Sequence, residues 1–429
     1  MIKEILAKQY DIEDKLIDFV YECESKLNLK FQELEKIKEY NQYKVLSALQ
    51  KNRISDMHFG WRTGYGYDDP GRDAAEKVYS DIFNTESALV RPTIVNGTHA
   101  LGITLMGILR PGDEVVYCSN GPYDTLEEVI GLRNTGKGSL IDYGISYKEV
   151  RLKSDGSIDL NEIRKVLTYK TKMVCVQRST GYSWRKALTV EQIRKWADFI
   201  HENRPDIICM VDNCYGEFTD ILEPTDVGAD IMAGSLIKNP GGGLALSGGY
   251  VCGKKELIDL VSYRMTCPGI GAECGLTFGQ TRATLQGIFL APSVVNGALK
   301  SAVLCGKVFG ELGYAVCQKS DDRRSDIIQA IELGNEDSVI AFCQGIQAAA
   351  PVDSFVSPEP WDMPGYDDKV VMAAGSFIQG SSIELSADAP MRKPFIVYFQ
   401  GGLTYEHGKL GILLALSKLA KKGLLKGEI

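Results

Sequence analysis

An aspartate and a lysine stand at the ends of two apolar segments. Asp212 follows the run Ile207–Val211, and Lys238 comes twenty-six residues later in the glycine-rich stretch G-S-L-I-K-N-P-G-G-G. A lysine amine can form a Schiff base with the aldehyde of pyridoxal phosphate, and a carboxylate can keep that cofactor's pyridine nitrogen protonated. Taken singly, Asp212 could be a helix cap and Lys238 a surface residue. The pair predicts a pyridoxal phosphate site in which both are catalytic.

Two further segments could hold the phosphate of such a cofactor. In V-N-G-T-H-A, the residues Asn96, Gly97 and Thr98 begin a predicted helix, whose free N–H groups favour an anion. Ser235, three residues before Lys238, could donate its hydroxyl. A plain turn with an asparagine or threonine cap would also explain the first segment. We therefore expect these four residues to bind the phosphate, provided that the Asp212–Lys238 pair is a cofactor site.

Two tyrosines are placed to contact the ring of the cofactor. Tyr123 follows the predicted strand Glu114–Cys118 and could stack on the ring. Packing of a turn tyrosine on its own domain explains Tyr123 equally well. Tyr215, three residues after Asp212, could reach the phenolic oxygen of the cofactor.

Two arginines are alternative ligands for a substrate carboxylate. Arg392 lies in D-A-P-M-R-K-P-F before a predicted strand, and Arg178 follows the predicted strand Met173–Gln177. A guanidinium group can bind a carboxylate through two parallel hydrogen bonds. Either arginine could instead have a structural role.

Alternating apolar strands and amphipathic helices must position these residues. This alternation predicts an α/β fold with a mainly parallel sheet covered by helices on both faces. The predicted strands, in chain order, are Ser87–Arg91, Glu114–Cys118, Ser139–Asp142, Met173–Gln177 and Ile207–Val211. The predicted helices are Ala74–Phe83, Thr98–Leu109, Thr125–Leu132, Asp159–Leu167 and Thr189–His201.

The length of 429 residues predicts more than one domain. We expect two N-terminal helices and an interface loop over 1–70, a large cofactor-binding domain over 71–300, and a smaller C-terminal α+β domain over 301–429. In the last part we predict strands at Val370–Ala373, Ser382–Leu385 and Phe395–Phe399, and a helix at Thr404–Lys422.

Composition excludes several other classes of protein. The net charge of −8 and the lack of a long basic run argue against a nucleic-acid partner. The chain has no run of eighteen apolar residues, so we expect no membrane span. Eleven scattered cysteines, only four histidines and no C-x-x-C motif indicate reduced thiols, no metal site and a cytoplasmic location.

These motifs resemble those of fold-type I pyridoxal phosphate enzymes of cysteine and methionine metabolism, which share the aspartate-aminotransferase-like fold. Within that group the chain resembles the methionine gamma-lyase-like, cystathionine beta-lyase-related proteins called aluminium resistance proteins. The resemblance extends over nearly the whole chain. Its most distinctive stretches are H-F-G-W-R-T-G-Y-G-Y-D-D-P-G-R-D, V-N-G-T-H-A, V-D-N-C-Y-G-E-F, G-S-L-I-K-N-P-G-G and Y-F-Q-G-G-L-T-Y-E-H.

The resemblance implies that Lys238 is the Schiff-base lysine, that Asp212 is the pyridinium partner and that Tyr123 stacks on the ring. It also implies that a loop carrying Tyr65 and Tyr67 completes the phosphate site of a neighbouring subunit. A homodimer would then be the smallest working unit, and tetramers are common in the group. The chain departs from the trans-sulfuration enzymes at Tyr67, where they usually carry arginine.

The resemblance favours a carbon–sulfur lyase acting on a sulfur-containing amino acid such as cystathionine or methionine, by β- or γ-elimination. Lys238 would remove the Cα proton, and Tyr123 is a candidate acid for the leaving sulfur. The Asp-x-x-Tyr spacing of Asp212 and Tyr215 is more typical of aminotransferases, so amino transfer or aldol cleavage is an alternative. A non-catalytic metal-stress protein with a degenerate site is a further one.

Overall fold

The computed structural model describes residues 1–363, 368–427 and 429. The chain divides into two compact units, which we call the large and the small unit. The large unit comprises Tyr40–Gly181 and Ala187–Ala291, and the small unit comprises Met1–Glu39, Tyr182–Lys186 and Pro292–Ile429. Compact units are not the same as independently folding domains, so the predicted domain boundaries at residues 70 and 300 stay a prediction.

A seven-stranded sheet forms the centre of the large unit, in the order β1-β7-β6-β5-β4-β2-β3. The neighbours from β6 to β3 are parallel, whereas β7 is antiparallel to both β6 and β1. The strands are β1 (Ser87–Arg91), β2 (Glu114–Tyr117), β3 (Ser146–Glu149), β4 (Thr171–Gln177), β5 (Ile208–Asp212), β6 (Ile231–Ser235) and β7 (Gly249–Gly253). The predicted α/β class with a mainly parallel sheet is confirmed.

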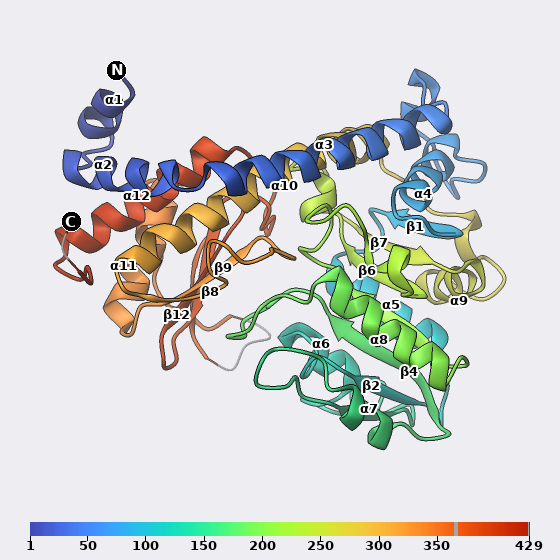
Figure 1. Ribbon diagram of the computed structural model, residues 1–429. Helices are drawn as coiled ribbons and strands as arrows, with labels where there is room; N and C mark the ends of the chain where they lie inside the picture. The colour runs from blue at the N-terminus through green and yellow to red at the C-terminus, as the bar shows by residue number, and fades with distance from the viewer. Residues whose placement is uncertain (364–367, 428) are drawn as a thin grey trace. The chain divides into compact units, whose positions relative to one another are not determined.

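Helices cover both faces of this sheet because successive strand residues point to opposite faces. Val115 and Tyr117 of β2 belong to an apolar cluster that includes α5 and α9. On the other face, Figure 1 shows α8 lying in front of the strands. The helices of the large unit are α4 (Pro70–Ile82), α5 (Gly97–Ile108), α6 (Asp124–Ile130), α7 (Leu160–Val166), α8 (Val190–Asn203) and α9 (Lys255–Met265).

One predicted strand of the large unit is wrong. Ser139–Asp142 forms a turn, and the strand next to β2 is β3, a few residues later. The Asp142 carboxylate accepts hydrogen bonds from the backbone N–H groups of Gly136, Gly138 and Ser139. An aspartate that satisfies three local N–H groups stabilises a turn at the expense of a strand.

The small unit contains an antiparallel five-stranded sheet in the order β10-β11-β12-β9-β8. Its strands are β8 (Ala315–Cys317), β9 (Ile328–Glu332), β10 (Val370–Ala373), β11 (Ser386–Pro390) and β12 (Ile396–Gln400). Its helices include α1 (Ile2–Gln9), α2 (Asp14–Ser25), α11 (Glu336–Ala348) and α12 (Tyr405–Lys421). The strand predicted at Ser382–Leu385 is wrong, because β11 begins only after it.

Two long helices continue from one unit into the other, α3 (Asn28–Lys51) and α10 (Thr281–Glu311). The N-terminal segment therefore forms three helices, where the sequence predicted two. Among the described residues, α10 is the one helix long and apolar enough to cross a membrane, but 72% of its apolar window is buried inside the protein. Such burial is typical of a core helix.

Candidate active site

Asp212 and Lys238 follow neighbouring parallel strands. Asp212 is the last residue of β5, and it pairs in register with Ala233 of β6. Lys238 comes three residues after the end of β6, just before the 3-10 turn Asn239–Gly241. Because parallel strands end at the same edge of a sheet, the structure places both side chains at the carboxyl edge, where open α/β sheets bind ligands.

Lys238 is a half-buried residue at this edge, and its amine lies over an aromatic ring. Its Nζ atom is 4.1 Å from the centre of the Tyr215 ring. Burial alone would lower the pKa of Lys238, but the negative potential of Cys214, Tyr215 and Asp212 outweighs burial and raises it. We give most weight to Asp212, since thiol and phenol groups are neutral at ordinary pH. In the free protein Lys238 is therefore a stabilised ammonium group.

Asp212 is also half-buried, and its carboxylate is held by the loop that follows it. Its Oδ1 atom accepts a hydrogen bond of 3.1 Å from the backbone N–H of Cys214. Burial raises the pKa of Asp212, and the charge of Lys238 opposes that rise. A carboxylate with one local donor keeps acceptor capacity for a further N–H group.

The start of α5 provides a place for an anion beside the same loop. Asn96 caps the helix by accepting from the N–H of His99, so its side chain is used locally. Gly97 leaves room that a side chain would fill. A Cβ atom there would lie 3.3 Å from the Cβ of Ser235 and 3.4 Å from the Sγ of Cys214. The structure thus brings Gly97, Ser235 and Cys214 together.

Tyr123 stands at the N-terminus of α6, next to the start of α5. The hydroxyls of Thr98 and Thr125 lie 2.7 Å apart and join the two helix starts. The ring of Tyr123 packs near Gly181, 3.5 Å from the place that a Cβ atom would take there. The ring-stacking role of Tyr123 stays a prediction.

Arg178 is completely buried, and its guanidinium group is engaged in the protein. It pairs with Glu223 at 3.3 Å and donates hydrogen bonds to Asn213 and Thr219. These contacts join the end of β4 to the loop that carries Asp212 and Tyr215. The geometry favours a structural role for Arg178 over the predicted role as a substrate ligand.

Arg392 belongs to the small unit, and its side chain is about half exposed. It forms an ion pair of 3.1 Å with Asp368. Its predicted contact with a substrate carboxylate stays a prediction.

Tyr65 and Tyr67 lie in the loop before α4 and point into solvent. Their side chains are 73% and 57% exposed, and their rings stack at 5.4 Å. Trp61 in the same loop is 68% exposed. Three exposed aromatic rings in one loop are typical of a surface that another chain covers.

Two functional candidates, Glu217 and Tyr250, were not predicted from the sequence. Glu217 is completely buried behind the Asp212 loop and accepts a hydrogen bond of 2.7 Å from the hydroxyl of Tyr250 in β7. The only signal was an acidic residue in V-D-N-C-Y-G-E-F that no surface pattern explained.

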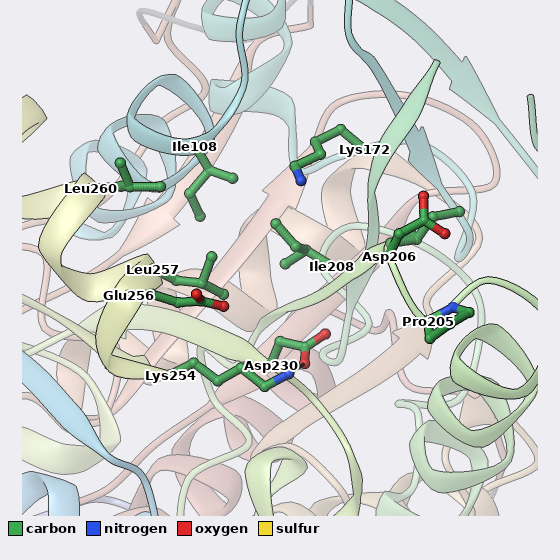
Figure 2. A pocket seen from close by; sticks show the side chains of 11 residues that line it. Ile108, Lys172, Pro205, Asp206, Ile208, Asp230, Lys254, Glu256, Leu257 and Leu260 are labelled. Carbon is green, nitrogen blue, oxygen red and sulfur yellow. Dashed lines mark ion pairs between the residues drawn. The ribbon is translucent and has the colours of Figure 1, made fainter. Parts of the chain in front are cut away.

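A second polar region lies at the opposite edge of the sheet, where β5 begins. A cavity of about 320 Å³ lies there, and Lys254 pairs with Asp230 at 2.6 Å. Figure 2 shows the side chains that line this cavity. Apolar side chains such as Ile108 and Leu257 line much of the rest. Because the central lysine and aspartate neutralise each other, we assign no chemistry to this cavity.

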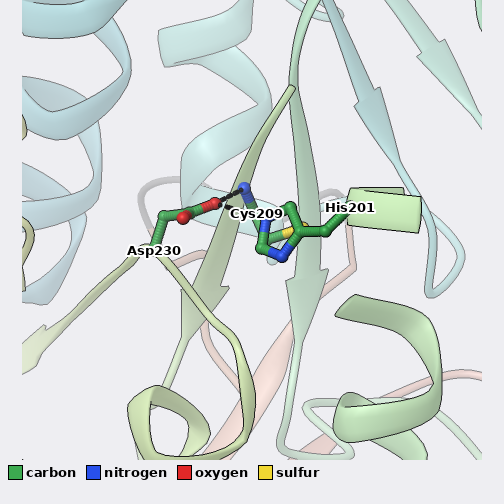
Figure 3. Close-up of side chains that lie close together, drawn as sticks. All are labelled: His201, Cys209 and Asp230. Carbon is green, nitrogen blue, oxygen red and sulfur yellow. Dashed lines mark hydrogen bonds and ion pairs between the residues drawn. The ribbon is translucent and has the colours of Figure 1, made fainter. Parts of the chain in front are cut away.

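Three possible metal ligands meet beside this cavity. Figure 3 shows His201, Cys209 and Asp230, whose ligand atoms all lie within 4.8 Å of one another. Asp230 already accepts from His201 at 3.0 Å, from the Cys209 backbone at 2.7 Å and from Lys254. Burial raises the pKa of Cys209 well above its ordinary value, which disfavours the thiolate that a metal needs. The cluster fits a structural role, and the expected lack of a metal stays a prediction.

The carboxyl-edge residues fit pyridoxal phosphate. The Lys238 amine matches the aldehyde of the cofactor, and the Asp212 carboxylate, with spare acceptor capacity, matches its pyridine nitrogen. The start of α5, which has no side chain at Gly97 and lies beside Ser235, matches its phosphate. The fold and this site define the class of fold-type I pyridoxal phosphate enzymes. A cystathionine gamma-lyase from Lactobacillus plantarum shares the fold at 15% identity, with a TM-score of 0.57 over 82% of this chain and 86% of that one.

Comparison with known proteins places the chain within this class. Residues 16–420 match the methionine gamma-lyase family, so the chain belongs to that family and its cofactor is pyridoxal phosphate. A carbon-sulfur lyase involved in aluminum resistance from Clostridium novyi is 53% identical, with a TM-score of 0.94 over 97% of this chain and 98% of that one. The YnbB protein of Bacillus subtilis is 50% identical over 92% of this chain and 94% of its own length. The predicted resemblance is confirmed.

Proposed function

We propose that the protein is a carbon–sulfur lyase that acts on a sulfur-containing amino acid such as cystathionine or methionine. One observation carries the proposal: the Lys238 amine lies at the carboxyl edge of the sheet, over the Tyr215 ring, and the negative charge of Asp212 raises its pKa. Membership of the methionine gamma-lyase family supports the lyase class.

Each residue of the site has a defined task in this proposal. Bound pyridoxal phosphate supplies an electron sink for negative charge at the substrate Cα. Lys238 Nζ takes the Cα proton, for which it must first be unprotonated. The Asp212 carboxylate holds a proton on the pyridine nitrogen, and Tyr123 stacks on the ring and gives a proton to the leaving sulfur.

Phosphate binding and assembly are parts of the same proposal. The N–H groups of Gly97 and Thr98 and the hydroxyl of Ser235 hold the phosphate. Tyr65 and Tyr67 reach it from a neighbouring subunit, so a dimer is the smallest active form and a tetramer is expected. Their exposure supports this arrangement. All eleven cysteines are free, which supports a reducing compartment such as the cytoplasm.

Amino transfer or aldol cleavage is the second candidate, favoured by the contact between Tyr215 and Lys238. Elimination releases a thiol and a keto acid with ammonia, whereas amino transfer leaves the cofactor in its pyridoxamine form. Absorption spectra after addition of an amino acid separate these outcomes. A non-catalytic metal-stress protein would need neither Lys238 nor Asp212 in its present setting.

The experiment is a screen of sulfur-containing amino acids for release of keto acid and thiol. The wild-type protein should release both from at least one of them. Lys238→Ala should lose the activity by a factor on the order of 10² to 10⁴, the range for loss of a general base. Lys172→Ala, an exposed lysine at the opposite edge, is the matched control and should be unaffected. Absence of both products from every amino acid tested would refute the lyase.

A further inference from the structure

Behind the proposed active site lies a buried acid to which no role has been given. The Glu217 side chain is inaccessible to solvent. Its Oε1 atom accepts from the Tyr250 hydroxyl at 2.7 Å, whereas Oε2 has no hydrogen-bond partner among the described residues. An ionised carboxylate in this setting would leave an unpaired charge in the interior, which is costly. The neutral acid avoids that cost.

The acid is built into the segment that carries Lys238. The backbone oxygen of Glu217 accepts a hydrogen bond of 3.0 Å from the side chain of Asn239, the residue after Lys238. Gly234 in β6 makes room for the pair, since a Cβ atom there would lie 2.8 Å from the Tyr250 hydroxyl and 2.9 Å from Glu217 Oε1. Glu217 is thus fixed behind both the strand and the loop that present Lys238.

Among the described residues, no cation forms an ion pair with the Glu217 carboxyl group. The Lys44 amine lies 5.8 Å from the centre of the neighbouring Phe218 ring, and its charge lowers the pKa of Glu223. Arg178 pairs with Glu223, and Lys238 faces Asp212. Burial is the main reason that the pKa of Glu217 rises, to about 8. The charge of Glu223 raises it further, while the Tyr250 hydrogen bond and Lys238 lower it. The described titratable groups that interact electrostatically with Glu217 include Tyr79 of α4, Cys214 and Glu223 after β5, Lys238 after β6, and Tyr250 and Cys252 of β7.

We propose that Glu217 is a positioning residue that holds a proton behind Lys238 and thereby controls the charge of the Lys238 nitrogen. This inference rests on the proposed role of Lys238. While Glu217 is neutral, Asp212 supplies the main negative charge near Lys238, and the amine can give up its proton to act as a base. When Glu217 ionises in alkaline solution, a second negative charge stabilises the proton on Lys238 Nζ. A smaller fraction of Lys238 is then unprotonated and able to act as a base.

The test follows the visible absorption of the cofactor bound at Lys238 between pH 6 and pH 10, with no amino acid present. The wild type should show an inflection near the pKa of Glu217, about 8. Glu217→Gln keeps the shape and the hydrogen bond from Tyr250 but cannot ionise, so this inflection should vanish. Tyr250→Phe keeps the acid and removes a hydrogen bond that favours its ionised form, so the inflection should move upward by one pH unit or more.

A second readout uses the cofactor-free protein. The wild-type melting temperature should fall from pH 6 to pH 9, since the unfolded chain ionises Glu217 more readily than the folded one. That of Glu217→Gln should fall less. Identical pH dependence of wild type and Glu217→Gln in both measurements would overturn the inference. If Glu217→Gln does not fold, an unshifted inflection in Tyr250→Phe overturns it and an upward shift supports it. Neither readout involves a sulfur amino acid, so failure of the lyase screen is a separate result.

Discussion

The amine of Lys238 lies 4.1 Å from the centre of the Tyr215 ring, and Tyr215 holds a left-handed backbone conformation with φ of 69°. A residue other than glycine in this region costs on the order of 1–3 kcal/mol. A local hydrogen bond offsets part of this cost, because Gly216 donates its backbone N–H to the carbonyl of Asn213 at 2.9 Å and closes the turn. The strained turn directs the tyrosine ring toward the lysine.

Replacement of Tyr215 tests this contact. Tyr215→Leu removes the ring, whose attraction for an ammonium group is about 0.5–2 kcal/mol, so the pKa of Lys238 should fall by roughly one unit. Tyr215→Phe keeps the ring and should have a smaller effect. The pH dependence of cofactor binding to the free protein measures the change, because binding needs the neutral amine. A larger effect for Phe than for Leu would contradict the ring contact.

Gly97→Ala tests the phosphate position at the start of α5. The added Cβ atom meets Ser235 and Cys214 at 3.3 and 3.4 Å, where we place the phosphate. We expect cofactor affinity to fall about tenfold, equivalent to about 1.4 kcal/mol. The cofactor-free protein should melt almost unchanged, since alanine favours a helix. Gly102→Ala in the same helix meets only Val129, at an ordinary 3.5 Å, and serves as the control.

Arg178→Met tests whether this arginine is structural. Loss of one partner leaves Glu223 buried and uncompensated, which should lower the free energy of unfolding by roughly 3–5 kcal/mol. The double variant Arg178→Met with Glu223→Gln should recover part of that loss. Urea unfolding of the cofactor-free protein measures both. A stable single variant with a raised KM would instead restore the substrate-binding role.

We expect the fold to lose stability in acid because of Glu35, a residue of the small unit. Burial opposes its ionisation, but hydrogen bonds from Lys300, Lys38 and Asn296 lower its pKa to about 2. A lowered pKa stabilises the fold above the ordinary value near 4.5, and the contribution disappears as the pH falls toward 2. Since the side chain is 40% exposed, we expect roughly 1 kcal/mol after screening.

Glu35→Gln checks this contribution. The difference in unfolding free energy between wild type and variant should be largest near pH 6 and should shrink toward pH 2. Glu33→Gln, which removes an exposed pair with Lys30, is the matched control and should change little at any pH. An equal difference at pH 6 and pH 3 would show that Glu35 acts only through packing.

Strong local patterns were sufficient to predict most elements that hold the site. The strands Ser87–Arg91 and Val370–Ala373 occur with the predicted bounds, because short apolar runs lie between turn residues. The strands predicted at Ser139–Asp142 and Ser382–Leu385 do not form, because these segments contain few apolar residues. At Asp142, local hydrogen bonds to backbone N–H groups decided in favour of a turn. Sequence spacing carries little information about such competition.

The order of residues along the chain was enough to place Asp212 and Lys238 at strand ends. Because the ends of parallel strands share an edge of the sheet, the same order predicted that the two residues meet, and with that the class of cofactor. Only the tertiary structure decided the charge states of the buried groups around the site. Tyr250 comes from β7, far along the chain, and its packing buries Glu217 and favours a neutral acid. Likewise, the sequence left a substrate-binding and a structural role open for Arg178, and the structure pairs it with the buried Glu223. Burial depends on what packs from elsewhere, and no local pattern records that.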